Sequence, residues 1–217
     1  MTDDQLLKSD VELELTWSPE IDASHIMVSA ADGAVTLSGY VPSYFEKMRA
    51  VACAERVYGV KAVADEMEVR LHASHEKQDS EIAKSVAHIL EWSTALAAQP
   101  IKATVSNGHV TLTGEVAWNY QLEEAGRAVE RVVGVRSVAN RITVKPHVQA
   151  SEVEKQIKNA LTRNAALDAR RIHVTTLGNK AILTGHVHSL TEDRVARNAV
   201  WQAEGIGEVE DHLVIQP

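Results

Sequence analysis

The chain has 217 residues, 45% of them apolar, with 22 Lys and Arg against 30 Asp and Glu, so its formal net charge is −8. This sign argues against nonspecific binding to nucleic acid, which requires basic residues on the phosphates. The single cysteine, Cys53, excludes an intramolecular disulfide framework. Its alanine-rich helical surroundings predict a small core residue.

The start of the chain is acidic, at Asp3 and Asp4, and charges interrupt every apolar run. A secretory signal needs a basic start and a continuous apolar stretch, and a membrane span needs about eighteen apolar residues. We therefore expect no transmembrane segment and a cytoplasmic protein. A periplasmic location is the alternative if a signal peptide has been removed.

Three blocks of the sequence repeat one pattern, at residues 32–41, 107–116 and 178–187. Their second glycines, Gly39, Gly114 and Gly185, are 75 and 71 residues apart. A later landmark keeps the same offsets. Its members are Gly59-Val60, Gly134-Val135 and Gly205-Ile206, each followed by a polar turn residue, Asp65, Asn140 or Asp211. This duplication predicts three tandem domains, at residues 1–74, 75–147 and 148–217.

Each repeat is expected to open with an amphipathic helix, because apolar residues recur near a spacing of 3.6. The positions are Leu7, Val11 and Leu15, then Ile82, Val86, Ile89 and Leu90, then Val153, Ile157, Ala160 and Leu161. A β-hairpin follows. Asp32-Gly33 and Asn107-Gly108 favour a type I′ turn, and the reversed pair Gly178-Asn179 also tolerates that conformation.

The strand after each turn alternates apolar and polar residues, and its second glycine, such as Gly39, is expected to allow close helix packing or a bend. A second helix should run over about 44–58, 119–133 and 190–204, ended by the glycines of the later landmark. The last strand should pair in parallel with the second. The fold class is therefore α+β: three tandem αββαβ repeats, each a three-stranded mixed sheet with two helices on one face. Because one such core is thin, we expect the repeats to touch.

This pattern of hairpin, glycine, Gly-Val step and Asp or Asn resembles the BON family, named for bacterial osmotically inducible and nodulation proteins. The resemblance covers essentially the whole chain in three copies. It implies a non-catalytic module, frequent in envelope and stress proteins, that contacts phospholipid. Typical members carry a secretory signal or a lipoprotein anchor, and neither is visible in this sequence.

Catalytic motifs such as Gly-x-Ser-x-Gly or His-Glu-x-x-His are missing from the sequence, so we expect no enzyme and no cofactor. Ten histidines are the unusual count. Pairing of the third hairpin should place His173 opposite Thr184, with His186 and His188 on the same strand face. These three could form a metal site, or they could be surface histidines.

Trp17 and Trp92 are 75 residues apart and occupy the same position, near the end of a first helix. Exposed there, they would suit a lipid interface or a protein contact; buried, they would cover the core. Trp118 and Trp201, at the start and end of second helices, are expected to pack between repeats.

Charge is uneven along the chain: the net charge is −7 over residues 1–75, zero over 76–147 and −1 over 148–217. An anionic headgroup should therefore meet the second or third repeat, unless the basic residues only form a solvated mixed-charge surface. The predicted lipid-binding residues are Trp92, Arg127, Arg131, Lys155, Lys158, Arg170 and Arg171. The sequence predicts a non-enzymatic, stress-associated protein that binds anionic phospholipid or another envelope component. The alternative is a cytoplasmic scaffolding module that binds a protein partner or itself.

Overall fold

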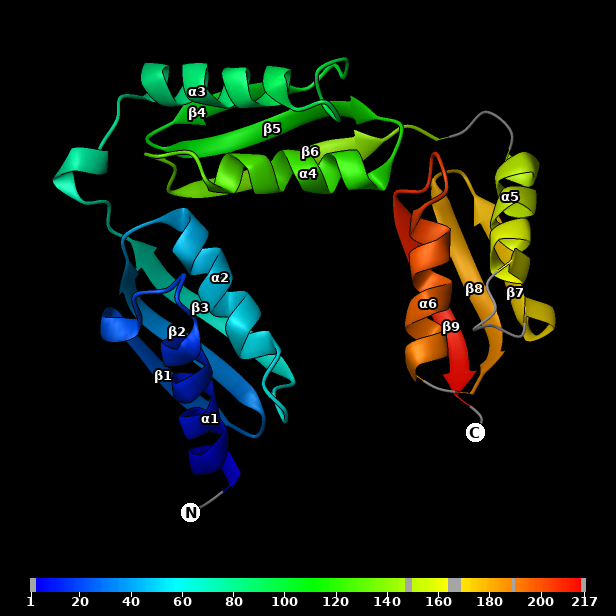
Figure 1. The fold of residues 1–217 in the computed structure, drawn as a ribbon, viewed down its shortest axis with the longest axis horizontal. Helices are drawn as coiled ribbons and strands as arrows, with labels where there is room; N and C mark the ends of the chain where they lie inside the picture. The colour runs from blue at the N-terminus through cyan, green and yellow to red at the C-terminus, as the bar shows by residue number, and fades with distance from the viewer. Residues whose placement is uncertain (1–2, 147–149, 164–168, 189, 216–217) are drawn as a thin grey trace. The chain divides into compact units, whose positions relative to one another are not determined.

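The computed structural model describes residues 3–146, 150–163, 169–188 and 190–215. These residues form three separate three-stranded sheets, one in each sequence repeat (Figure 1). Contacts divide the chain into two compact units, the first of residues 1–86, 104–110 and 128–139 and the second of residues 87–103, 111–127 and 140–217. The middle repeat contributes residues to both units.

The three repeats share the order helix, strand, strand, helix, strand. Repeat 1 consists of α1 (Asp3–Trp17), β1 (Ile26–Ala31), β2 (Ala34–Val41), α2 (Tyr44–Glu55) and β3 (Ala62–Val69). Repeat 2 consists of α3 (Asp79–Trp92), β4 (Lys102–Ser106), β5 (His109–Val116), α4 (Asn119–Glu130) and β6 (Ser137–Val144). Repeat 3 consists of α5 (Ala150–Arg163), β7 (Ile172–Leu177), β8 (Lys180–Val187), α6 (Leu190–Trp201) and β9 (Glu208–Ile215). Short 3₁₀ turns are η1 (Ala23–His25), η2 (Ala73–His75) and η3 (Ala169–Arg171).

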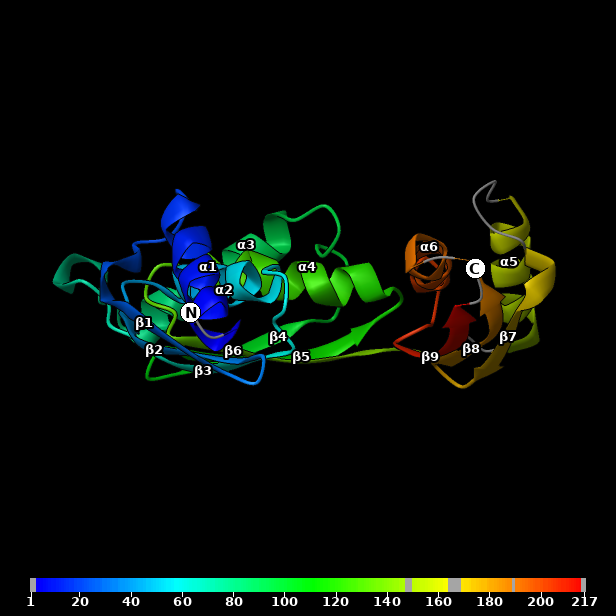
Figure 2. The same ribbon diagram turned by 90° about the horizontal axis from the view of Figure 1, so that it is seen from below.

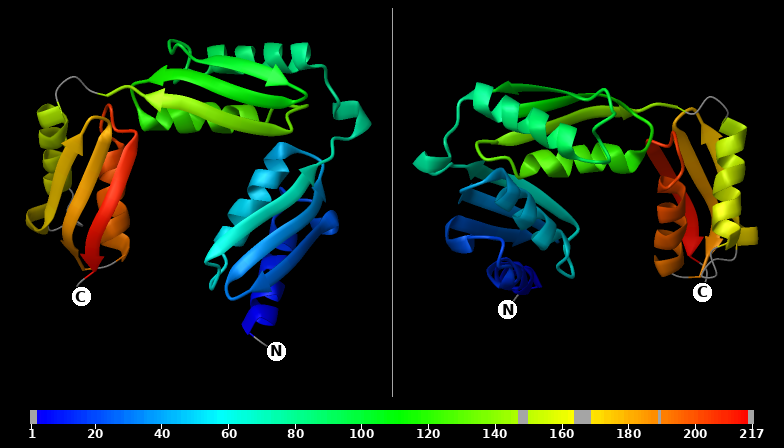
Figure 3. Two further views of the ribbon diagram at one scale, coloured as in Figure 1. Left: turned by 180° about the vertical axis from the view of Figure 1, so that it is seen from behind. Right: turned by 45° about the horizontal axis from the view of Figure 1, so that its top comes forward.

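Both helices of a repeat lie on one side of its own sheet (Figure 2). The left view of Figure 3 shows the opposite, uncovered side of the repeat 1 sheet. The sheet is mixed, because β2 pairs antiparallel with β1 and parallel with β3. In repeat 3, β8 pairs in the same way with β7 and β9. The predicted α+β class and the parallel last strand are confirmed.

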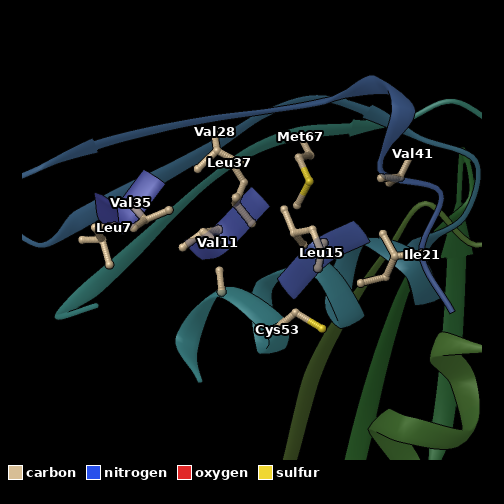
Figure 4. Packing of buried hydrophobic residues seen from close by; sticks show 12 residues of the cluster. Leu7, Val11, Leu15, Ile21, Val28, Val35, Leu37, Val41, Cys53 and Met67 are labelled. Atoms are coloured by element: carbon tan, nitrogen blue, oxygen red, sulfur yellow. The ribbon is translucent and has the colours of Figure 1, made fainter. Parts of the chain in front are cut away.

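The core of repeat 1 lies between the helices and the sheet. Leu7, Val11 and Leu15 of α1 are buried and point toward the strand residues Val35 and Leu37 (Figure 4). The small residues Ala50, Cys53 and Ala54 of α2 close the cluster, so the helix can approach the sheet. Cys53 is a buried free cysteine, as predicted. Repeat 3 has an equivalent cluster built on Val153, Ile157, Leu161, Val174, Leu183, Ala196 and Val200.

The hairpin turns follow their dipeptides. Asp32 and Gly33 have φ of +52° and +85°, and Asn107 and Gly108 have +52° and +77°, as a type I′ turn requires. In the third hairpin Gly178 has φ of +63°, whereas Asn179 is not among the described residues with positive φ. A positive φ at the first central position alone is the type II′ pattern, so the third turn differs from the one we predicted.

The second glycine of each hairpin faces backbone and not a helix, so close helix packing, one of the two predicted alternatives, is wrong. A Cβ added to Gly39 would collide with the carbonyl oxygen of His25, which immediately precedes β1. Gly114 meets the carbonyl of Pro100 in the same way, and Gly185 that of Arg171. All three have positive φ. The glycine is therefore needed for the close approach of the connection that enters the first strand.

The second helices end three residues earlier than predicted, at Glu55, Glu130 and Trp201. After α2, Arg56 and Val57 donate to the carbonyls three residues back, at 3.3 and 3.2 Å, so the last turn tightens. Gly59 lies beyond it in the following turn with φ of +94°. It is therefore not the residue that ends the helix.

The polar residue of the later landmark lies inside a strand and not in a turn as predicted. Asp65, Asn140 and Asp211 belong to β3, β6 and β9. Each accepts a hydrogen bond from the backbone N–H two residues later, at 3.1, 3.2 and 2.9 Å. Each also faces a second-helix group: Lys47 for Asp65, the Leu122 carbonyl for Asn140 and Arg197 for Asp211. The position thus ties the last strand to the second helix.

Candidate interaction surfaces

Trp17 and Trp92 are the last residues of α1 and α3, and 86% and 76% of their surfaces are exposed. They do not cover a core, so the alternative of a core lid is wrong. The buried side of α1 is occupied by Leu7, Val11 and Leu15, and Trp17 lies on another face of the helix. The equivalent helix of repeat 3 ends at Arg163.

An exposed apolar stripe runs along α1. Leu6, Leu13 and Trp17 are 46%, 65% and 86% exposed, and their spacings of seven and four place them on one helix face. On α3 the corresponding residues are Glu81, His88 and Trp92. The rings of His88 and Trp92 are 5.0 Å apart. Trp92 therefore stands beside a histidine in a more polar stripe.

The predicted basic residues lie on separate elements, namely α4 and the turn after it, α5 and η3. Arg127 on α4 pairs with Glu123 and Glu124, at 3.6 and 3.8 Å. Lys158 on α5 pairs with Glu154 at 2.5 Å, and Lys155 is exposed on the same helix. Arg170 and Arg171 are exposed in η3. Surface pairs of this kind contribute little to stability and can be exchanged for other anions.

Arg131 belongs to an apolar groove in the first compact unit, which sequence reasoning missed. The groove encloses about 350 Å³ and is lined on one side by Pro42, Phe45 and Leu71. Residues 130–135 form the other side. The guanidinium groups of Arg49 and Arg131 both lie over the Phe45 ring, with their Cζ atoms 5.2 and 4.9 Å from its centroid. The contact between Phe45 and Arg131 joins two distant segments, so no local motif predicts it.

Trp118 lines a second groove, in the second compact unit, of about 300 Å³. Its partners there include Ile157 and Ala160 of α5 and Ala203, which follows α6. Trp118 thus packs against residues of the next repeat, as expected. Trp201 packs against the core of its own repeat instead.

The sequence matches the BON domain over residues 3–70, 78–146 and 149–217. The chain belongs to the BON domain family. It is 31% identical over 149 residues to Osmotically-inducible protein Y of Escherichia coli (strain K12), which covers 66% of this chain and 73% of that protein.

Solved structures give weaker similarities. CdsD, a structural protein of the type III secretion system of Chlamydia trachomatis, matches 96% of this chain and 91% of its own with 17% identity and a TM-score of 0.28. The PrgH periplasmic domain matches 88% of this chain and 95% of its own with 11% identity and a TM-score of 0.24. At these TM-scores neither similarity bears on function.

The outward face of the third BON repeat carries histidines. His173 lies opposite Thr184, as predicted, and His186 follows two residues later on the same strand. The parallel strand adds His212, which pairs with Thr184 from the other side and was missed because its register depends on the crossover. His188 is exposed beyond the end of β8, so the prediction that it shares the strand face with His186 is wrong. Among the described residues, no three His, Cys, Asp or Glu side chains gather closely enough to hold a metal ion.

Charged pairs fill the rest of that face. Lys180 lies 3.0 Å from Glu208 and 2.5 Å from Glu210, and its hydrogen bonds to Glu210 and Glu208 raise the pKa of Lys180. The pKa of Glu210 is lowered, chiefly by Lys180 and then by His212, whose Nε2 is 2.8 Å away. The face therefore presents paired charges of both signs.

A buried carboxylate distinguishes the helix side of the same repeat. Asp193 on α6 is 9% exposed and faces Asp211 of β9. Burial raises the pKa of Asp193, and the hydrogen bond and charge of Asp211 raise it further. Arg197 contacts both carboxylates, at 2.8 and 3.2 Å, and opposes the shift.

In the part of the chain that the structure describes, no helix is both long and apolar enough to cross a bilayer.

Proposed function

We propose that this BON protein is a stress-associated, non-catalytic protein that binds anionic phospholipid or another anionic envelope component, with Trp92 in the membrane interface. The observation that carries the proposal is the exposure of Trp17 and Trp92 at matching helix ends. A large ring that is three-quarters exposed is costly in water and suits the amphipathic boundary of a bilayer. The similarity to an osmotically inducible protein supports the association with stress.

The charge of the surrounding repeat favours Trp92 over Trp17 as the residue that contacts an anionic membrane. Repeat 1 has six basic against thirteen acidic residues, and Asp10 lies between Leu6 and Leu13 on the same helix face. Repeat 2 is balanced, with eight of each. An anionic surface would repel the end of α1 more strongly than the end of α3. The residues proposed to supply attraction are those predicted from the sequence: Arg127, Arg131, Lys155, Lys158, Arg170 and Arg171.

Those basic residues should act additively and weakly. Each Lys or Arg near an anionic bilayer contributes about 1 kcal/mol at low salt, and the contribution falls off within a Debye length. Because the structure places them on separate elements, we expect no single one to be essential. Binding should weaken steadily as salt is added.

Flotation on vesicles of phosphatidylcholine mixed with phosphatidylglycerol tests the proposal. The full chain should float at low salt, and Trp92→Ala should lower the bound fraction several-fold. Trp17→Ala is the matched control, since it removes the same ring from the same helix position, and it should float like the unaltered protein. Absence of flotation on anionic vesicles at low salt, or an equal loss in both variants, would contradict the proposal.

We also propose a cytoplasmic location, so the protein would contact the leaflet of the membrane that faces the cytoplasm. Fractionation of cells that express a tagged full-length gene product checks this separately. Recovery of the protein from the periplasmic fraction would move the contact to an envelope component on that side. Self-association is a second candidate function. It is favoured by a contact between equivalent parts of neighbouring repeats that occurs once in each compact unit.

A further inference from the structure

One contact is formed inside the first compact unit between the strand ends of repeat 1 and the turn that follows α4. Arg136 donates from Nη1 to the carbonyl of Val69 at 3.5 Å. Gly134 and Pro42 line the same groove. The contact therefore joins the ends of β2 and β3 to the turn between the second helix and last strand of the next repeat.

The second compact unit contains a contact between equivalent residues. Gly205 donates from its backbone N–H to the carbonyl of Ala117 at 2.8 Å. A Cβ added to Gly207 would lie 2.9 Å from Cβ of Val144. By the offsets of 75 and 71 residues, Ala117 and Val144 correspond to Pro42 and Val69. Gly205 and Gly207 correspond to Gly134 and Arg136.

Each repeat thus carries two surfaces that can meet. The leading surface holds the residue after the second strand and the end of the last strand: Pro42 and Val69, Ala117 and Val144, or His188 and Ile215. The trailing surface holds the turn after the second helix: Gly59 and Lys61, Gly134 and Arg136, or Gly205 and Gly207. The two contacts above each join a leading surface to the trailing surface of the following repeat.

The trailing surface of repeat 1 and the leading surface of repeat 3 take part in neither of these two contacts. Both expose apolar side chains. Tyr58, next to Gly59, is 98% exposed, whereas its counterpart Val133 is 51% exposed beside the groove of the first unit. Val214 and Ile215 are 51% and 43% exposed. Large exposed apolar residues on a defined surface commonly mark protein contacts.

We propose that a second copy of the chain joins these two surfaces, the leading surface of repeat 3 in one copy docking on the trailing surface of repeat 1 in the next. This goes beyond the proposed lipid binding and does not depend on it. The occupant is a second copy because the chain already forms this contact between its own repeats twice. Such an interface joins different surfaces, so it propagates into rings or open chains and does not stop at a symmetric dimer.

The chemistry of the two surfaces supports the match. Lys61 corresponds to Arg136 and is a cationic donor, so it could bond to the carbonyl of Ile215 as Arg136 does to that of Val69. The Gly59 N–H could donate to the carbonyl of His188, as Gly205 does to Ala117. An open cavity of about 600 Å³ beside Tyr58, Gly59 and Lys61 offers space for the side chains of Val214 and Ile215.

The expected affinity is low. Within the chain, neighbouring repeats are linked, and a short linker gives an effective concentration of about 1 mM. A contact that forms under those conditions can have a dissociation constant near that value between separate chains. Self-association should therefore be followed from about 10 μM to about 1 mM. The weight-average mass should rise over that range and pass the mass of a dimer.

Two substitutions at opposite ends of the chain test the proposal by sedimentation equilibrium. Tyr58→Asp blocks the trailing surface and Ile215→Asp blocks the leading surface. Each should weaken association at least about tenfold, since a buried unpaired charge at an interface costs that much or more. Met27→Asp is the matched control, because Met27 is 63% exposed on the open sheet face of repeat 1. It should associate like the unaltered chain.

Mixing the two variants gives the decisive result. The Tyr58→Asp chain retains its leading surface and the Ile215→Asp chain retains its trailing surface, so the mixture should form heterodimers and nothing larger. Circular dichroism spectra that match the unaltered chain show that the variants are folded. A chain that stays monomeric to about 1 mM, or variants that associate normally, or a mixture that forms no dimer, would overturn the proposal.

Discussion

Repeats 1 and 3 have equivalent cores, but they differ in the charges that surround one acidic residue of the last strand. In repeat 1, Asp65 on the last strand faces Lys47 on α2 at 3.1 Å, so opposite charges meet. In repeat 3, the equivalent Asp211 faces a second carboxylate, Asp193, and Arg197 must serve both. Repeat 2 has the neutral Asn140 there. The backbone geometry is common to the repeats, whereas the charge around it is not.

The largest expected effect tests the shared geometry. Gly39→Ala and Gly185→Ala should each destabilise their own repeat by about 3 kcal/mol, because a Cβ at either site meets a carbonyl oxygen at positive φ. Hydrogen exchange of β1–β2 and β7–β8 measures the two repeats separately. Gly178→Ala is the control: nothing lies within 4 Å of its Cβ, so only backbone strain of about 1 kcal/mol remains. Equal costs at Gly39 and Gly178 would contradict the close approach.

The next effect concerns the pair in repeat 1. Lys47 also donates to the carbonyl of Met67 at 2.5 Å, and its side chain is only 19% exposed. Lys47→Met keeps the apolar stem but leaves Asp65 without its counter-charge, so repeat 1 should lose about 2 kcal/mol of stability. The double variant with Asp65→Asn should recover part of the loss. Urea unfolding that is unchanged in the single variant would show that the pair contributes nothing.

In repeat 3, removing a charged side chain should raise the stability of the repeat instead of lowering it. Asp193→Asn removes a buried negative charge that faces Asp211, so it should stabilise repeat 3 by about 1 kcal/mol at pH 7. A carboxyl whose folded pKa is raised holds its proton more tightly when folded. Stability therefore falls as pH rises from the ordinary value of 3.8 through the raised pKa.

The advantage of Asp193→Asn should accordingly shrink toward zero as pH is lowered to about 3.8. Hydrogen exchange of α6 and β9 at two pH values measures the difference. An advantage of equal size at both pH values would mean that Asp193 is not the titrating group.

The smallest expected change is at the open sheet face of repeat 3. Lys180→Gln removes a cation that bridges Glu208 and Glu210, but all three groups are at least partly exposed to solvent. Exposed pairs contribute little, so thermal unfolding of the chain should be unchanged. The pKa of Glu210, lowered by Lys180, should rise toward its ordinary value, which NMR titration of the side chain can follow.

The sequence predicts the elements whose signal is local. The spacing of Leu7, Val11 and Leu15 identifies the buried face of α1, and Asp32-Gly33 identifies the turn of the β1–β2 hairpin. It leaves the reason for Gly39 open between helix packing and a bend, because the His25 carbonyl that demands a glycine comes from a segment without a recognisable motif. It places Asp65 in a turn, because Asp and Asn are typical turn residues and the Lys47 that pairs with Asp65 comes from a distant segment.

Features that need two distant segments were not accessible from the sequence. The contact of Arg131 with the Phe45 ring and the position of His212 beside Thr184 both depend on how separate elements meet. The exposure of Trp92 was one of two alternatives that periodicity left open, since the residue follows an apolar run at a helix end. The predicted basic residues are exposed and lie on several elements, whereas their role in lipid binding stays a prediction.

Tryptophan fluorescence tests the proposed membrane contact most directly. A chain that keeps Trp92 alone, with Trp17, Trp118 and Trp201 changed to Phe, is titrated with vesicles containing phosphatidylglycerol. The emission should shift to shorter wavelength as the ring leaves water, while a matched chain that keeps Trp17 alone should not shift. An unchanged spectrum for Trp92 at saturating anionic lipid and low salt would contradict the account.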